Sequence, residues 1–118
     1  MILRTLRPLL GVPAPPPPQL VLPAGVEVRS GRWVPVIGGL FTRDHHAAAV
    51  TLGDTIIVHP DVLVSERLLR HELTHVRQWR ERPWSFAWRY ARNHLRHGYR
   101  DNPYEIAARA AEHDHADA

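Results

Sequence analysis

Residues 71–75 read HELTH, inside the segment LLRHELTHVRQW of residues 68–79. Histidines four positions apart lie one turn apart on the same face of a helix, so the imidazoles of His71 and His75 can reach one metal ion. Glu72 is rotated by about 100° from His71, which places its carboxylate beside the metal, where it can take a proton from water. The stretch therefore predicts a helix that carries a metal site.

The residues around the motif set the expected length and burial of this helix. Asp61 can cap its start and Pro83 stops it, so we expect a helix from about Val62 to Arg82. Successive residues turn by about 100°, and one apolar stripe results that should enter the core. That stripe consists of Leu69, Leu73 and Val76.

The sequence before the helix predicts a short sheet. Ala48–Leu52 and Thr55–Val58 are strand-like apolar runs on either side of Gly53-Asp54, a dipeptide typical of a hairpin turn. Residues 26–40 are apolar with interspersed glycines, which indicates one or two irregular strands.

The start of the chain differs in composition from the rest. Residues 13–18 read PAPPPP, a run that favours polyproline II and cannot join a helix or a central strand. We therefore expect residues 1–25 to be a proline-rich leader or linker and residues 26–118 to form one folded domain, which is the size that 118 residues allow.

Two more helices are expected after the motif. Trp84–His97 carries a stripe at helical spacing that we expect to face the core, and Gly98 should end this helix. Pro103 suits the first turn of a third helix, which carries Glu105. The stripe consists of Trp84, Trp88, Ala91 and Leu95. The fold class expected from these elements is α+β.

A catalytic zinc site needs three protein ligands and one open position. The chain has no cysteine and nine histidines, so the ligands must be imidazoles and carboxylates. Glu81 continues the motif helix on its arginine-bearing, solvent-facing side, and we reject it. Glu105 is the preferred third ligand because the third helix can pack against the motif helix and present a carboxylate, and Glu112 is the reserve. The competing interpretation of Glu105 is a surface residue stabilised by the helix dipole.

Taken together, HELTH and the later E-x-x-A segment from Glu105 to Ala108 resemble the gluzincin branch of the zincin metallopeptidases. AAAVTLGDTIIV before LLRHELTHVRQW, and GYRDNPYEIAARAAE after it, are similar to small bacterial zincin-like domains, some of them attached to toxins or injection systems. The resemblance covers about residues 45–112.

The resemblance implies a minimal zincin-like fold: a short antiparallel sheet or hairpin packed on the HExxH helix, with two further C-terminal helices. It implies Zn²⁺ bound by His71, His75 and Glu105, with Glu72 as general base. It also implies that Ala48–Val58 supplies an edge strand along which an extended peptide or protein substrate lies. Arg109 stands where some gluzincins place an aspartate that orients a ligand histidine, so that support must come from other residues.

These observations predict a zinc-dependent peptidase. The tetrahedral oxyanion also needs a hydrogen-bond donor, for which Tyr99 and His97 are candidates and Tyr104 and His94 further ones. A separate hypothesis is that the ligand-rich tail, residues 113–118, occupies the open zinc position and makes the protein latent.

Two alternatives stay open. The first is a catalytically inert or latent zinc-binding interaction module. The second, less favoured, is a nucleic-acid-binding protein that uses the arginines of the second expected helix, although a solvated face opposite the tryptophans is the preferred explanation of these residues: Arg82, Arg89, Arg92 and Arg96. The first twelve residues make a poor secretory signal and no apolar run is long enough to span a membrane, so we expect a cytoplasmic protein.

Overall fold

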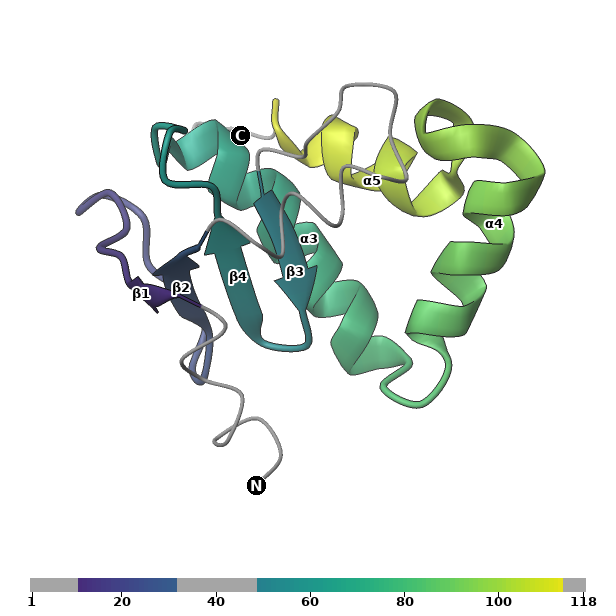
Figure 1. The fold of residues 1–118 in the computed structure, drawn as a ribbon, viewed down its shortest axis with the longest axis horizontal. Coiled ribbons are helices and arrows are strands. Elements are labelled where there is room, and N and C mark those ends of the chain that lie inside the picture. Colours follow the sequence, from purple (N-terminus) through teal and green to yellow (C-terminus); the bar gives the residue numbers. More distant parts are fainter. Residues whose placement is uncertain (1–10, 32–48, 114–118) are drawn as a thin grey trace.

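The computed structural model describes residues 11–31 and 49–113 and has an α+β architecture (Figure 1). Among these residues a four-stranded sheet comes first and three helices follow it, which confirms the expected fold class. The elements are β1 (Val12–Pro13), β2 (Glu27–Ser30), β3 (Ala49–Leu52), β4 (Thr55–Val58), α3 (Glu66–Glu81), α4 (Phe86–Asp101) and α5 (Pro103–Ala111).

The sheet has the strand order β1-β2-β4-β3. β3 and β4 form the predicted antiparallel hairpin: Leu52 lies opposite Thr55, and Gly53 supplies the positive φ of 62° that the two-residue turn needs. β2 pairs parallel with β4 and antiparallel with β1, so the sheet as a whole is mixed. Of the expected edge strand Ala48–Val58, β4 is an inner strand and β3 lies at the edge, while Ala48 is outside the described residues.

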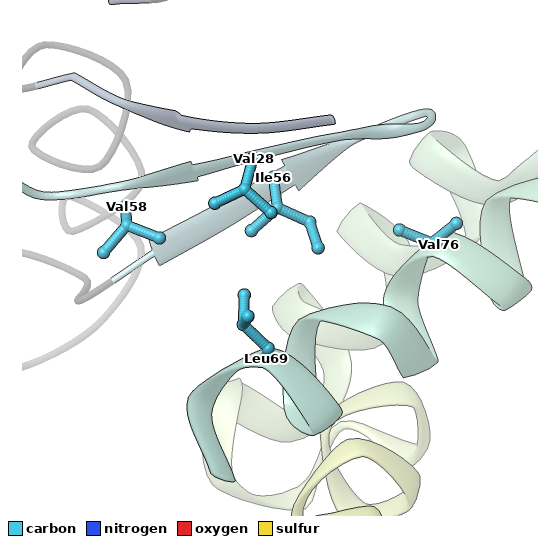
Figure 2. Packing of buried hydrophobic residues seen from close by; sticks show 5 residues of the cluster. All are labelled: Val28, Ile56, Val58, Leu69 and Val76. Carbon is cyan, nitrogen blue, oxygen red and sulfur yellow. The ribbon is translucent and has the colours of Figure 1, made fainter. Parts of the chain in front are cut away.

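The core lies between the sheet and α3 (Figure 2). Val28, Ile56 and Val58 project from β2 and β4 onto Leu69 and Val76 of α3. These five side chains are almost completely buried, which removes their apolar surface from water and fixes α3 against one face of the sheet. The predicted core face of the motif helix is therefore confirmed, with Leu73 half-buried at its margin.

The motif helix begins later than Val62 and has a different cap from the expected Asp61. Ser65 has an extended backbone, and its hydroxyl accepts a hydrogen bond from the Leu68 backbone N–H at 3.0 Å. Asp61 instead lies in a turn in which its own N–H donates to Nδ1 of His59. The expectation of a cap at Asp61 is wrong because the turn after β4 uses several residues before the helix can start.

The expected core stripe of the second helix is also wrong. α4 turns Phe86 inward, where its ring contacts Trp79 and Tyr104 at centroid distances of 5.1 Å. Trp84 lies before the helix and is 97% exposed, and Trp88 and Leu95 are exposed as well. Aromatic contacts to α3 and α5 determine which face of α4 points inward, and the spacing of apolar residues does not specify these contacts.

Gly98, which we expected to end the second helix, is a kink inside α4 with φ 79° and ψ 172°, and α4 continues to Asp101. The chain then reaches Asn102, a fully buried residue whose side chain accepts from the Tyr104 N–H at 3.0 Å and so caps α5. Pro103 occupies the first turn, as predicted. α5 packs along α3, with the buried Ala108 allowing close approach.

Residues 11–25, which the sequence analysis assigned to the leader, lie against the sheet. Val12–Pro13 pairs with β2, and the side chains of Ala14, Leu20 and Leu22 pack on the core. Three stretches lie outside the described residues: residues 1–10, residues 32–48 and the tail from residue 114. The second stretch includes residues 32–40 of the strand region that was expected at 26–40. Among the described residues, no helix is long and apolar enough to cross a membrane.

Candidate metal centre

Three potential ligands meet between α3 and α5. Nε2 of His71 lies 3.0 Å from Oε1 of Glu105, and Nε2 of His75 lies 3.2 Å from the same oxygen. All three side chains are buried, and their ligand atoms lie within 4.8 Å of one another. The structure thus brings together the three residues that the sequence analysis chose as metal ligands.

The donor set fits a zinc ion. A tetrahedral zinc with bonds of about 2.0–2.2 Å keeps neighbouring ligand atoms about 3.4 Å apart, close to both imidazole–carboxylate distances. Two imidazoles and one carboxylate without thiolates are a ligand set that zinc accepts in catalytic sites. His71, His75 and Glu105 would hold the ion.

The position of Glu105 follows from local structure. The buried Asn102 holds the start of α5: its side-chain amide donates to the Tyr90 carbonyl at 3.2 Å, and its own carbonyl accepts from the Glu105 N–H at 2.9 Å. Glu105 therefore stands in the first turn of a helix whose entry is tied to α4. This geometry directs its side chain at α3, and the surface interpretation of Glu105 is wrong, since the residue is 3% exposed.

His71 receives its support from the reserve candidate Glu112. Oε2 of Glu112 lies 2.8 Å from Nδ1 of His71, and its Oε1 accepts from the Arg67 guanidinium at 2.8 Å. A carboxylate only accepts once ionised, so Nδ1 carries the proton and Nε2 keeps its lone pair for a metal. Glu112 thus orients a ligand from the end of α5, the task for which Arg109 is unsuited.

His75 is held by Gln78 on the same helix. The Tyr104 carbonyl can only accept, so the Gln78 side-chain NH₂, at 3.1 Å, donates to it. This fixes the Gln78 carbonyl oxygen toward Nδ1 of His75 at 2.8 Å. His75 must then donate from Nδ1, which again leaves Nε2 free as a ligand. The orientation of the Gln78 amide is therefore set by the Tyr104 backbone carbonyl, and the tautomer of His75 follows from it.

Glu72 lies beside the ligands. Its Oε2 is 3.8 Å from Nε2 of His71, and its Oε1 accepts from the Thr51 hydroxyl at 3.0 Å. Burial raises the pKa of Glu72 against the opposing charges of His75 and His71. A carboxylate held beside the metal position with a raised pKa is suited to accept and return a proton.

In the metal-free centre, protons on the imidazoles offset the negative charge of the carboxylates. Burial disfavours the charged form of His71, but the hydrogen bond to Glu105 and the charge of Glu72 outweigh it and raise its pKa to about 9. The same balance raises the pKa of His75. Although burial favours the neutral acid, hydrogen bonds from both imidazoles hold the pKa of Glu105 well below its usual range. The cluster therefore requires positive charge between its side chains.

Two tyrosines line the centre. The Tyr90 hydroxyl donates to Oε2 of Glu105, the oxygen that the imidazoles leave unused. Tyr99, a predicted oxyanion donor, is 37% exposed, and burial together with the charges of Glu105 and Glu72 raises its pKa, so its hydroxyl stays protonated. His97, the other predicted donor, is exposed, and none of the described contacts joins it to the ligands.

The two further donor candidates, Tyr104 and His94, pack against aromatic rings. Tyr104 contacts the ring of Phe86, and His94 stacks on Tyr90 with ring planes 15° apart. Sequence reasoning missed Gln78, Tyr90 and Thr51. A signal existed for Gln78, which follows His75 by three positions and therefore lies on the same helix face.

The outer edge of β3 is partly covered beside the centre. In a two-residue hairpin the pair next to the turn exchanges hydrogen bonds, so at Thr51, one residue further, the backbone groups point away from β4. The Thr51 carbonyl accepts from the indole N–H of Trp79 at 3.1 Å. This contact ties β3 to α3 and places Thr51 next to Glu72.

Comparison with known proteins gives one family similarity. A family model described as the eCIS core domain matches residues 38–83. This range includes β3, β4 and α3, and so His71, Glu72 and His75, but ends before Glu105. The match covers less than half of the chain. No curated protein and no solved structure matches it.

Proposed function

We propose that this chain is a zinc-dependent peptidase. The observation that carries the proposal is the convergence of His71, His75 and Glu105 with the Glu72 carboxylate beside them. Two imidazoles and one carboxylate leave a fourth position for a reactant, and an acid–base group stands within reach of it. A purely structural zinc site would use four ligands and would not need Glu72 there.

A zinc ion at this position would supply Lewis acidity, which lowers the pKa of water and polarises a carbonyl. Glu72 accepts the proton of the attacking water and returns it to the leaving amine. Its hydrogen bond from Thr51 holds one carboxylate oxygen and leaves the other on the ligand side. Burial keeps this carboxylate in a medium where proton transfer to it is favoured.

Tyr99 is the donor that we assign to the oxyanion. It keeps its proton, it lies near Glu105 and Glu72, and it is open to solvent on one side, as a group that meets a substrate must be. The Tyr90 hydroxyl donates to Oε2 of Glu105, and we assign to it the task of fixing that ligand.

An extended peptide lying along β3 would bring its scissile bond toward Glu72 through Thr51, the residue shared by the strand and the site. Because Trp79 already occupies the Thr51 carbonyl, the strand can offer that peptide the Thr51 N–H and the outward groups of Ala49. We therefore propose a short substrate contact along β3 and not pairing over the whole hairpin.

The test is zinc-dependent cleavage of casein or a peptide library. Glu72→Gln keeps the shape of the side chain and removes its base, so it should abolish cleavage while zinc still binds. Glu81→Gln removes an exposed glutamate at the end of the same helix and serves as the matched control. Cleavage that survives in Glu72→Gln, or that persists in the presence of a chelator, would refute the peptidase.

A second candidate is a zinc-binding module without catalysis that takes part in an assembly. The similarity of residues 38–83 to the eCIS core domain, named for extracellular contractile injection systems, favours it. This candidate also requires zinc at His71, His75 and Glu105. It predicts stoichiometric zinc and no cleavage of any peptide in the library, with Glu72→Gln indistinguishable from the wild type.

A further inference from the structure

Large apolar side chains that are open to solvent lie on the outer face of α4 and in the turn that precedes it. Trp84 is 97% exposed, Leu95 86% and Trp88 60%. Within α4, Trp88 and Leu95 lie two turns apart on one side, about 10 Å along the axis, with the exposed Ala91 between them. These side chains are outside the core that the described residues form. The helix lies at the periphery of the molecule (Figure 1).

The same segment is strongly cationic. Between Glu81 and Asp101 the chain has no acidic residue and five arginines: Arg82, Arg89, Arg92, Arg96 and Arg100. All except the half-buried Arg89 are exposed. The guanidinium of Arg92 lies 4.7 Å above the Trp88 ring, so charge and aromatic surface occur side by side on one face. The attractive partner must therefore be anionic and must also accept indole and aliphatic groups.

We propose that α4 binds the surface of an anionic lipid bilayer, lying flat with Trp84, Trp88 and Leu95 in the interfacial layer. A helix with tryptophan and leucine on one side and arginines along its flank is the pattern of interfacial membrane helices. Phosphate and serine headgroups complement the arginines, and the indoles lie at the boundary between headgroups and acyl chains. The protein docks on the bilayer and does not span it.

Nucleic acid fits this face less well. Arginine and tryptophan can contact phosphates and stack on bases, but Leu95 and Ala91 offer neither charge nor a ring. They continue the apolar stripe for two helical turns beyond Trp88, where only an apolar medium gains from them. A bilayer interface uses the whole stripe.

Docking in this way leaves the metal centre uncovered. Phe86 and Tyr90 are on the inward side of α4, and the Tyr90 hydroxyl donates a hydrogen bond to Glu105. The stripe is on the opposite side. The proposal therefore does not depend on peptidase activity, and its test can fail or succeed independently of cleavage.

The experiment is co-sedimentation of the full chain with vesicles of equimolar phosphatidylserine and phosphatidylcholine, beside vesicles of phosphatidylcholine alone. We expect binding to the anionic vesicles, a loss of binding in high salt, and little binding to the neutral ones. Each change of Arg92 or Arg96 to glutamine should weaken partitioning about fivefold. Trp84→Ala combined with Trp88→Ala should weaken it at least about tenfold.

The matched control compares two leucines of equal exposure. Leu95→Ala should reduce vesicle binding, whereas Leu63→Ala, which changes a leucine 84% exposed and distant in sequence from α4, should not. Circular dichroism checks that both variants are folded. Equal effects of the two changes, or equal binding to neutral and anionic vesicles, would overturn the proposal.

Two further outcomes also count against it. Binding to single-stranded DNA without binding to vesicles would assign the face to nucleic acid. A dimer in analytical ultracentrifugation that Leu95→Ala dissociates, again without vesicle binding, would assign the stripe to a second copy of the chain.

Discussion

Raising the pH of the metal-free protein from 6.5 to about 9 should destabilise it, because His71 loses its proton over this range. The folded pKa of His71, about 9, lies above the model-peptide value of 6.5. Its contribution is therefore fully present below pH 6.5 and is lost as the pH rises through 9. The raised pKa of His75 acts in the same direction.

The size of the effect follows from the shift. A rise from 6.5 to about 9 corresponds to about 3 kcal/mol of preferential interaction with the charged imidazole. His71 is 8% exposed, so solvent screens this interaction little. Glu105 has the opposite window: its lowered pKa stabilises the fold above pH 4.5 and the contribution is lost as the pH falls below that value. The metal-free protein should therefore be most stable between about pH 4.5 and 6.5.

Zinc should reverse this dependence. Binding requires the lone pairs on Nε2 of His71 and His75, so the ion must displace the protons that the metal-free centre holds. For His71 alone, apparent zinc affinity should rise by up to roughly tenfold per pH unit, or roughly 150-fold between pH 6.5 and 9, where His71 is half deprotonated. Stabilisation by zinc thus grows over the range in which the metal-free protein weakens.

The assay is urea unfolding followed by circular dichroism, with a chelator and with excess zinc, at the two ends of this pH range. Glu105→Gln removes the carboxylate that raises the His71 pKa, so the slope of metal-free stability against pH should flatten in this variant whatever its absolute stability. If metal-free stability stays constant or increases from pH 6.5 to 9 in the wild type, or zinc affinity is the same at both ends, the proton balance described for the centre is wrong.

Two other changes test the support of the centre and the core. Glu112→Gln should lower zinc affinity about 10- to 100-fold, since it removes the charge that orients His71, while Glu81→Gln should leave a chelator-competition titration unchanged. Leu69→Ala should cost about 2–5 kcal/mol in urea unfolding because Leu69 is fully buried between α3 and the sheet, whereas the exposed Leu63→Ala should cost less than about 0.5 kcal/mol.

The sequence predicted the parts of the fold that local pattern determines. The hairpin around Gly53 depends on a turn dipeptide between two strand-like runs, and α3 depends on a helical spacing of apolar residues. Both are properties of a few neighbouring residues. The parallel pairing of β2 with β4 joins residues far apart in the chain, and no local pattern specifies it.

The prediction that the apolar stripe of α4 faces the core was wrong for a related reason. Helical spacing of Trp88 and Leu95 predicts that the two side chains share a face, which the structure confirms, but not whether that face meets the core. Phe86 and Tyr90, which contact α5 from the other side of the helix, determine which face of α4 packs inward. An amphipathic pattern therefore identifies a face, and only the remaining contacts show which partner it has.

The supporting shell of the metal centre was the least predictable part. His71 and His75 are linked by fixed spacing, and Glu105 by the start of a helix, but Glu112 and Gln78 act through hydrogen bonds whose donors are known only once α3 and α5 are packed together. Their residue types are common on helix surfaces. From the sequence, Glu112 was named only as a reserve ligand, and Gln78 shared a helix face with His75 without a role assigned to it.

The range that matches the eCIS core domain and the range that forms the metal centre are not the same. Residues 38–83 contain both imidazoles and Glu72, yet the third ligand, Glu105, belongs to α5, as does the support of His71 by Glu112 near its end. Two imidazoles alone hold zinc weakly, and one of them would lose the partner that fixes its tautomer. In this chain the packing of α5 on α3 supplies the carboxylate that joins the two imidazoles. Metal binding should accordingly depend on the α3–α5 contact as much as on the HELTH motif itself.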